Sequence, residues 1–175
     1  MNHRSTSRSI TRLLGYLACC TLPLFSASAT PVSTKQTSLM RSIDVRADAA
    51  SVWSAIGPFC AISAWHPAVD SCTLDGKTPP TRTLVTRDGA KFVELQLLRN
   101  DAHHRYDYSF TSSPLPVAHY RSTLRVIETG RNSSRIEWSS RFTAAPDKEQ
   151  PAREALTGIY DSGLASIKSR LEPTG

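Results

Sequence analysis

Residues 69–142 are dominated by short segments in which apolar and polar side chains alternate. Large apolar side chains lie two positions apart in the segments "HHRYDYSF", "HYRSTLRVIE" and "SRIEWSSRF". This period is typical of strands with one dry face and one wet face. Between two further alternating segments, the dipeptide Asp88-Gly89 is a strong hairpin signal. The pattern predicts six antiparallel strands and constrains the fold more than any other feature of the chain.

Helical patterns lie on both sides of this region. Apolar side chains three and four positions apart form a stripe over residues 150–171, which predicts one long terminal helix. Before the alternating region, a first strand is expected near 39–46, then a helix that Asp48 can cap, and a second short helix over 60–65. An α+β architecture follows, in which a curved antiparallel sheet of about seven strands wraps around the terminal helix. The tapering space between sheet and helix is suited to a ligand.

The N-terminal residues have the organisation of a secretory signal peptide. Three arginines and no acidic residue precede the apolar run "LLGYLACCTLPLF". That run is shorter than the roughly 20 residues that a helix needs to cross a bilayer. The small residues of "SASAT" then fit cleavage near Ala29. We expect a signal peptide over 1–29, a flexible polar segment over 30–38 and a periplasmic or secreted mature chain. An uncleaved or amphipathic anchor is the alternative.

Charge in the mature chain is nearly balanced. Removing the three N-terminal arginines leaves 18 of the 21 basic residues against 15 acidic ones. No block of lysine and arginine remains, which argues against nucleic acid as a partner. No second apolar run approaches membrane-spanning length, so no transmembrane segment is predicted after cleavage.

Two cysteines, Cys60 and Cys72, remain once residues 1–29 are removed. In an exported chain this pair favours a disulfide, and two buried free thiols are the alternative. A zinc site built from these cysteines and His66 lacks an evident fourth ligand, so we predict no metal and no other cofactor. We expect His66 to hydrogen-bond the backbone at a helix end, although a role as acid or base inside a cavity stays open.

Several stretches together carry a family resemblance: "DAASVWSAIGPF", "WHPAVDSC", "RTLVTRDGAKFVELQLL", "YDYSFTSSPLPVAHYRSTLRV" and the terminal helix. The chain resembles the START-like, helix-grip (SRPBCC, Bet v 1-like) superfamily, which includes the polyketide cyclase/dehydrase group and the plant abscisic-acid receptors. It is also similar to periplasmic accessory proteins of methanol oxidation. The resemblance covers roughly 39–171 and implies one START-like domain over 39–172. It further implies a pocket for a small apolar molecule, closed by loops at 86–92 and 111–117.

The resemblance also implies positions for binding residues. It places Glu94, Tyr108, Tyr120 and Ser122 where the plant receptors line their pocket. The strand alternation by itself turns Glu94 toward water, so the two arguments disagree on this residue. Trp65 stands where those receptors have a lysine that grips a carboxylate. A more apolar ligand, or one held by stacking, is therefore expected.

The remaining candidates come from the residue pattern. Tyr106 and Trp138 share a dry face with the tyrosines above, where they either surround a pocket or fill the core. Leu115 lies in a proline-stiffened loop and is expected at the pocket mouth or in a stiff connector. Tyr160 lies on the apolar stripe of the terminal helix. The predicted ligand-binding set is Trp65, His66, Glu94, Tyr106, Tyr108, Leu115, Tyr120, Ser122, Trp138 and Tyr160.

These features predict an exported protein that binds a small hydrophobic or amphipathic molecule in an internal cavity. One alternative is an enzyme of the cyclase, dehydrase or hydrolase type with Glu94 or His66 as general acid or base. No acid and base stand at a recognisable spacing, so no catalytic residue is predicted. The other alternative is a periplasmic accessory protein that contacts a redox enzyme through its surface, with the apolar loop around Leu115 as the contact.

Overall fold

The computed structural model describes residues 35–172, and the expected signal peptide over 1–29 lies outside the described residues. The elements, in chain order, are β1 (Thr37–Val45), α1 (Ala49–Ile56), α2 (Ile62–Trp65), β2 (Val69–Leu74), β3 (Thr81–Thr86), β4 (Lys91–Asn100), β5 (Arg105–Ser112), β6 (Ala118–Gly130), β7 (Ser133–Thr143) and α3 (Glu149–Leu171). The expected order of one strand, two short helices, six strands and a long helix is confirmed. No helix within 35–172 is long and apolar enough to span a membrane.

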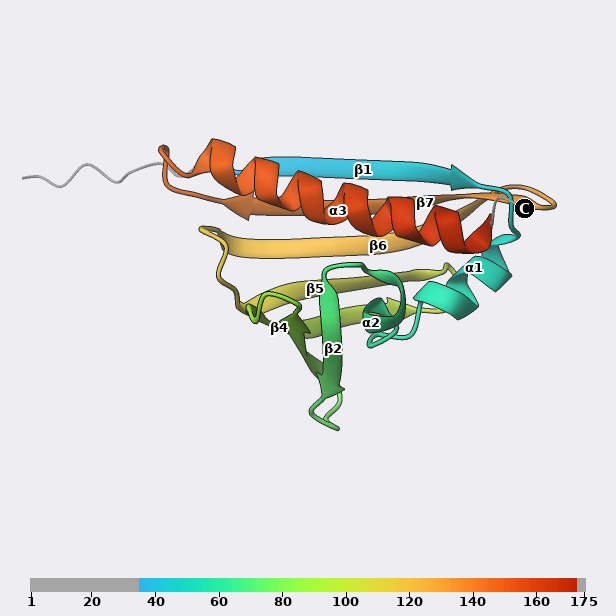
Figure 1. Cartoon of the computed structure of the whole chain (residues 1–175), viewed down its shortest axis with the longest axis horizontal. Helices are drawn as coiled ribbons and strands as arrows, with labels where there is room; N and C mark the ends of the chain where they lie inside the picture. The colour runs from blue at the N-terminus through green and yellow to red at the C-terminus, as the bar shows by residue number, and fades with distance from the viewer. Residues whose placement is uncertain (1–34, 173–175) are drawn as a thin grey trace, which may run out of the picture. The chain divides into compact units, whose positions relative to one another are not determined.

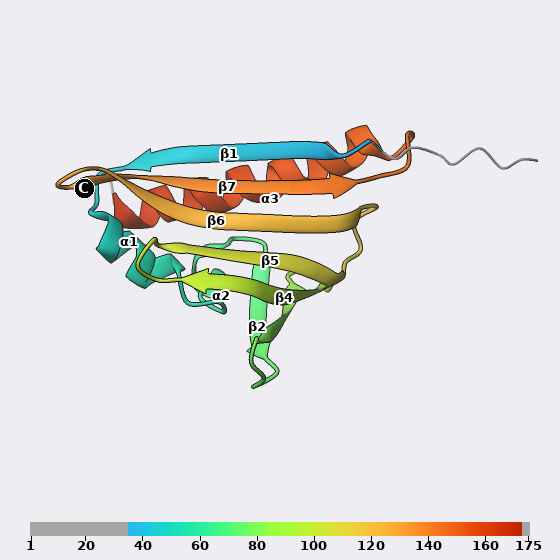
Figure 2. The ribbon, with the colours of Figure 1, turned by 180° about the vertical axis from the view of Figure 1, so that it is seen from behind.

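All seven strands form one antiparallel sheet in the order β1-β7-β6-β5-β4-β3-β2. Helix α3 runs along β1, β7 and β6, and the sheet curls so that β2 crosses on the same side as the helices (Figure 1). From behind, the open face of the sheet is seen with all three helices beyond it (Figure 2). The predicted curved sheet around a terminal helix is therefore confirmed.

Local chemistry explains where several elements begin and turn. The Asp48 carboxylate accepts a hydrogen bond from the Ser51 amide at 2.8 Å and caps α1, as predicted. The hairpin between β3 and β4 turns at Gly89, whose φ of 85° lies in the left-handed region that favours glycine. Strand β1 begins at Thr37 rather than near 39, and the buried Thr37 hydroxyl donates to Glu149 of α3. Thr37 and Ser38, which were expected in the flexible segment, therefore belong to β1.

The turn between β4 and β5 corrects another boundary. Residues His103 and His104 were expected to start a strand, but they lie in this turn, and β5 begins at Arg105. His104 has a φ of 45°, a left-handed conformation that does not continue a strand.

A disulfide joins Cys60 to Cys72, with 5.5 Å between the two Cα atoms. It connects the residues just before α2 to strand β2 at the edge of the sheet. The predicted pairing is confirmed.

Helix α3 packs closely on aromatic rings at Gly163. A Cβ atom at this position would stand 2.8 Å from Cδ2 of His66 and 2.9 Å from Cζ3 of Trp138. Both are rigid ring atoms, and contacts this short do not occur between real side chains. Glycine therefore sets the distance between α3 and the rings beneath it.

Candidate functional site

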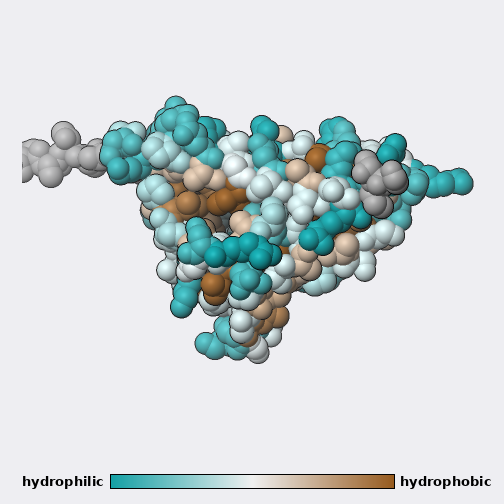
Figure 3. Space-filling view, in the orientation of Figure 1, coloured by the Kyte–Doolittle hydropathy of each residue, from teal (hydrophilic) through white to brown (hydrophobic). Residues whose placement is uncertain are grey.

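A cavity of about 590 Å³ lies between the concave face of the sheet and the first half of α3. Its wall is formed by residues from α2 through β7, by the loops at 86–90 and 114–115, and by α3. Figure 3 shows apolar surface gathered in a hollow beside the first half of α3. This volume is within the range of small-molecule sites, which commonly measure about 300–1,000 Å³.

Aromatic rings form much of the apolar wall. Phe110 of β5 stacks on Tyr120 of β6 with ring centroids 3.7 Å apart, and Phe92 of β4 lies against Phe110. Trp138 of β7 stacks on Tyr160 of α3 at 4.5 Å. These flat surfaces suit an apolar or aromatic guest.

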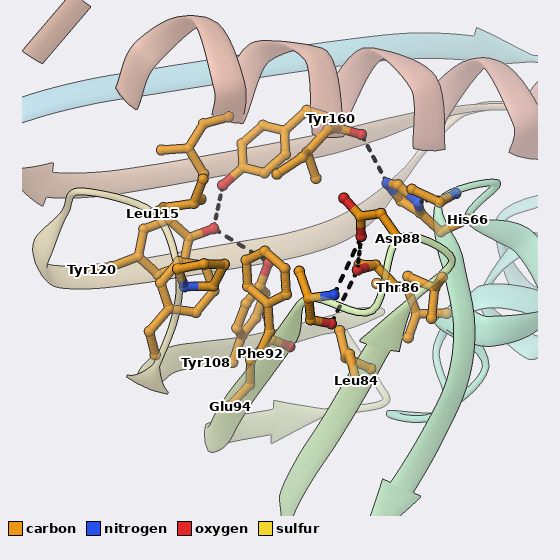
Figure 4. A pocket seen from close by; sticks show the side chains of 18 of the residues that line it. His66, Leu84, Thr86, Asp88, Phe92, Glu94, Tyr108, Leu115, Tyr120 and Tyr160 are labelled. Atoms are coloured by element: carbon orange, nitrogen blue, oxygen red, sulfur yellow. Dashed lines mark hydrogen bonds between the residues drawn. The ribbon is translucent and has the colours of Figure 1, made fainter. Parts of the chain in front are cut away.

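Three tyrosine hydroxyls meet on one side of the cavity. The Tyr120 hydroxyl lies 2.6 Å from that of Tyr160 and 3.5 Å from that of Tyr108. Trp138 Nε1 donates to the Tyr108 hydroxyl at 3.0 Å, and Ser122 lies 3.3 Å from the Tyr160 hydroxyl. Figure 4 shows Tyr160 pointing from α3 toward Tyr120 and Tyr108 on the strands. We call the three tyrosines with Trp138 and Ser122 the hydroxyl cluster.

Burial keeps these phenols neutral. It raises the pKa of Tyr108 and Tyr120 well above the usual value for tyrosine and that of Tyr160 to about 12. A phenolate in this environment would lose its hydration, and the nearby Arg82 guanidinium is already paired with Glu94. The hydroxyl cluster therefore offers hydrogen bonds at neutral pH and no negative charge.

Glu94 of β4 is buried and faces the cavity, so the interpretation from alternation alone was wrong for this residue. Its Oε2 accepts a hydrogen bond from Nε of Arg82 on the neighbouring strand β3. The Arg82 side chain is fully buried, also donates to the Phe59 carbonyl, and lies 4.0 Å from the centroid of the Phe59 ring. The pair explains how a carboxylate is tolerated inside the sheet.

The charges of this pair depend on each other. Burial raises the pKa of Glu94, and the Arg82 guanidinium opposes part of that increase. Burial is the largest influence on Arg82 and opposes its charge, but the Glu94 carboxylate together with Tyr106 and Tyr108 outweighs it and raises the pKa of Arg82. Because arginine does not give up its proton in proteins, an ionised Glu94 at neutral pH is the state that balances the buried charge.

His66 lies on the cavity wall at the C-terminal end of α2. Its Nε2 lies 3.0 Å from the Ile159 carbonyl of α3, and its Nδ1 accepts from the Ala68 amide at 3.2 Å. A carbonyl only accepts, so the pattern assigns the proton to Nε2. Both ring nitrogens thus bind backbone, as expected for a histidine at a helix end.

Burial lowers the pKa of His66 below its ordinary value. The unfolded chain therefore takes up this proton at a higher pH than the folded protein, and stability falls as the pH drops below about 6.5. We expect His66→Gln to lose less unfolding free energy than the wild type between pH 7 and pH 5, with a difference of at most about 1.4 kcal/mol per pH unit. Urea unfolding at several pH values measures this free energy. The exposed His103→Gln control should keep the wild-type slope, and an unchanged slope in His66→Gln would contradict this origin.

Seven of the ten predicted binding residues lie on the cavity wall: His66, Glu94, Tyr108, Leu115, Tyr120, Trp138 and Tyr160. The other three, Trp65, Tyr106 and Ser122, do not line it. Tyr106 is covered by Trp53 and Phe59, whose ring centroids lie 5.9 and 5.5 Å away. The Ser122 hydroxyl donates to the Ser139 carbonyl and lies behind Tyr160.

Trp65 faces a different space from the one expected. Its ring packs edge-on against Trp138 at 5.6 Å, and it lines a separate cavity of about 180 Å³ between α1, α2 and the end of α3. The position equivalent to the receptor lysine therefore does not reach the larger cavity in this chain.

Sequence reasoning missed Arg82, Phe92 and Phe110. Arg82 and Leu84 share the inward face of β3, so the period of two contained a signal for Arg82. An arginine is rarely placed inside from sequence, because it is almost never fully buried unless it is paired.

A curved sheet that grips one long helix over an apolar cavity defines a helix-grip protein. The comparisons identify the family: the model described as polyketide cyclase / dehydrase and lipid transport matches residues 36–172. The chain belongs to this family, and the superfamily expected from the sequence is confirmed. A search of curated proteins found no significant match.

Solved structures agree with this assignment. An uncharacterized protein from Bacillus thuringiensis and the protein XoxI from Bacillus cereus are each 31% identical and superpose with a TM-score of 0.73. Each alignment covers 77% of this chain, with 98% of the first and 94% of the second protein. Norcoclaurine synthase from Thalictrum flavum, in complex with dopamine and hydroxybenzaldehyde, is 19% identical with a TM-score of 0.65 over 82% of this chain and 91% of its own. At that identity it shows a shared fold alone.

Proposed function

We propose that this protein binds a small, largely apolar molecule in the cavity between the sheet and α3. The observation that carries the proposal is the 590 Å³ cavity, whose wall is mostly aromatic and aliphatic with a few converging polar groups. Membership of a family that includes lipid transport supports it. The aromatic stacking surfaces of Phe110 and Trp138 suit a guest that carries a ring.

We further propose that the protein works after export. The basic, then apolar, then small-residue organisation of residues 1–29 supports a signal peptide. The bond between Cys60 and Cys72 is independent support, since disulfides persist in oxidising compartments. Periplasmic location follows if the source cell has an outer membrane. Detection of a mature chain that begins near residue 30 in the exported fraction tests this part.

Binding is favoured over catalysis by the state of the two candidate acid/base groups. His66 uses both ring nitrogens on backbone partners, and Glu94 is held by Arg82. A general base needs a free nitrogen or oxygen within hydrogen-bond reach of the proton that it removes. Within the described residues, His66 has no free nitrogen, and the titratable side chain that hydrogen-bonds Glu94 is an arginine, which keeps its proton. The site therefore supports holding a guest more directly than converting one.

A block of the cavity tests the proposal. Ile159 lies on the cavity wall in α3, and Ile159→Trp fills part of the space. We expect this variant to weaken uptake of an apolar probe such as naphthalene at least about 10-fold, because the guest and the indole compete for one volume. Calorimetric titration and quenching of tryptophan fluorescence both report the uptake.

The matched control is Ala165→Trp, at an exposed position on the same helix. It adds the same ring outside the cavity and should bind the probe like the wild type. If wild-type protein shows no saturable uptake of any apolar probe, or if both variants bind equally well, the proposed function is wrong.

A further inference from the structure

The two ends of the hydroxyl cluster fix the direction of its hydrogen bonds. At one end, the indole Nε1 of Trp138 can only donate, and it donates to the Tyr108 hydroxyl. At the other end, the Ser139 carbonyl can only accept, and Ser122 donates its single hydroxyl proton to it at 2.7 Å. The oxygen of Ser122 is left with acceptor capacity alone.

These two ends also determine which phenol donates and which accepts in each contact between them. Because Ser122 has no proton left, the Tyr160 hydroxyl donates to it. Tyr160 then accepts from Tyr120 across the 2.6 Å contact, and Tyr120 accepts from Tyr108. One continuous chain of donors runs from the indole to the carbonyl, and every hydroxyl proton in it is used.

The opposite direction satisfies fewer groups. If Tyr160 donated to Tyr120, and Tyr120 to Tyr108, the Ser122 oxygen would accept nothing and the Tyr108 proton would be left over. The first arrangement keeps one more internal hydrogen bond, and buried polar groups are rarely left unpaired. In that arrangement the phenols present lone pairs to the cavity and no free proton.

The other polar groups of the inner wall lead to the same result. Glu94 accepts from Arg82 through Oε2, and a carboxylate has no proton to donate. The Nε2 proton of His66 is held by the Ile159 carbonyl. Arg87, a donor, also lines the cavity, but most of its side chain is exposed to solvent, with its Nε on the Pro67 carbonyl and its Nη1 4.0 Å from Asp70.

We infer that the cavity selects small apolar molecules whose polar group donates hydrogen bonds, an ammonium or a hydroxyl, over molecules that only accept and over anions. The inference rests on the proposed function and adds the chemical class of the ligand. A ligand that donates adds a hydrogen bond to the existing cluster. A ligand that only accepts must first reverse the direction of the hydrogen bonds in the cluster, or its acceptor stays unpaired beside the Glu94 carboxylate.

Four probes with one apolar body test it: 1-naphthylmethylamine, 1-naphthylmethanol, 1-(methoxymethyl)naphthalene and 1-naphthoate, titrated calorimetrically into the purified protein at pH 7. The amine and the alcohol are expected to bind about 3- to 10-fold more tightly than the ether, the effect of one hydrogen bond. The naphthoate is expected to bind most weakly.

If the ether or the naphthoate binds as tightly as the two donors, the inference is overturned while the proposed function stands. If neither naphthalene nor any of the four binds, both fail.

A variant inside the cluster gives a second, independent reading. Tyr160→Phe removes the acceptor for Tyr120, so one phenolic proton becomes available to the cavity. The advantage of the alcohol over the ether should then shrink by about 3- to 10-fold. The control Tyr106→Phe removes a buried hydroxyl from the same sheet face outside the cavity wall and should keep the wild-type ratio. An unchanged ratio in Tyr160→Phe, or an equal change in both variants, overturns the inference.

Discussion

Replacing Glu94 by leucine is expected to lower the free energy of unfolding by about 3–5 kcal/mol at pH 7. The substitution leaves the fully buried guanidinium of Arg82 without its countercharge. Arginine cannot escape this penalty by losing its proton, because its pKa stays far above neutral. Urea unfolding followed by circular dichroism measures the change. A loss below about 1 kcal/mol would show that the pair does not carry a buried charge.

Arg82→Met provides the matched half of the comparison. The glutamate that remains can be protonated, and its burial raises the pKa of Glu94 in the folded state above that in the unfolded chain. The folded state then binds more protons, so the stability of this variant should fall as the pH rises above about 4.3. At pH 5 we expect Arg82→Met to be less destabilised than Glu94→Leu, with the gap narrowing toward pH 8.

The double variant Arg82→Met/Glu94→Leu separates charge from packing. Apolar pairs that replace buried ion pairs are often neutral or stabilising, so the double variant should recover most of the loss seen in Glu94→Leu. If the two single losses simply add, the side chains act independently and the ion-pair interpretation is contradicted.

Removing the disulfide is expected to have the second largest effect. The double variant Cys60→Ala/Cys72→Ala, which leaves no unpaired thiol from this bond, should lose about 2–4 kcal/mol of unfolding free energy. The physical reason is the freedom that the unfolded chain regains when a loop closed over a sequence separation of 12 is opened. Urea unfolding of both proteins measures the difference.

Reduction of the wild-type protein is the control for this experiment. With excess dithiothreitol, the wild-type midpoint should move to that of the double variant, while the variant should not respond. A variant as stable as the oxidised wild type would show that the bond adds nothing beyond the packing of α2 on β2.

Local signals made most of the fold predictable from the sequence. The cap at Asp48, the turn at Gly89 and the period of the strands each depend on a few neighbouring residues. The cysteine pairing was predictable because only two candidates remained after the expected cleavage. The order of the strands in the sheet was not predicted, because pairing between distant segments leaves no signal in a local pattern.

The face of β4 shows where local reasoning failed. The alternation grouped Glu94 correctly with Phe92 and Gln96, but it assigned the group to water because the opposite set contains leucines. In the structure, Leu97 and Leu98 are both exposed, beside a register irregularity between Gln96 and Leu98. Burial of Glu94 depends on its pairing with Arg82 of β3, which the pattern of β4 does not contain, so hydrophobicity by itself assigned the wrong side.

The candidate site was predictable only in part, since a cavity wall depends on what covers each side chain. Tyr106 and Tyr108 share one strand face, yet only Tyr108 lines the cavity. Trp53 and Phe59 cover the ring of Tyr106. The ion pair joins Glu94 to Arg82, which lies 12 positions earlier in the sequence on a different strand. Neither arrangement has a signature in a single segment.

The close contact at Gly163 separates the part of α3 that borders the cavity from the part that follows. The half after Gly163 is fixed in place, because a single added methyl group would collide with His66 and Trp138. The half before it carries Leu156 and Ile159, which border the cavity, and is anchored by the ring of Tyr160 on Trp138. We therefore expect exchange of Ile159 to change the size of guest that the cavity accepts, while Gly163 preserves the orientation of the helix.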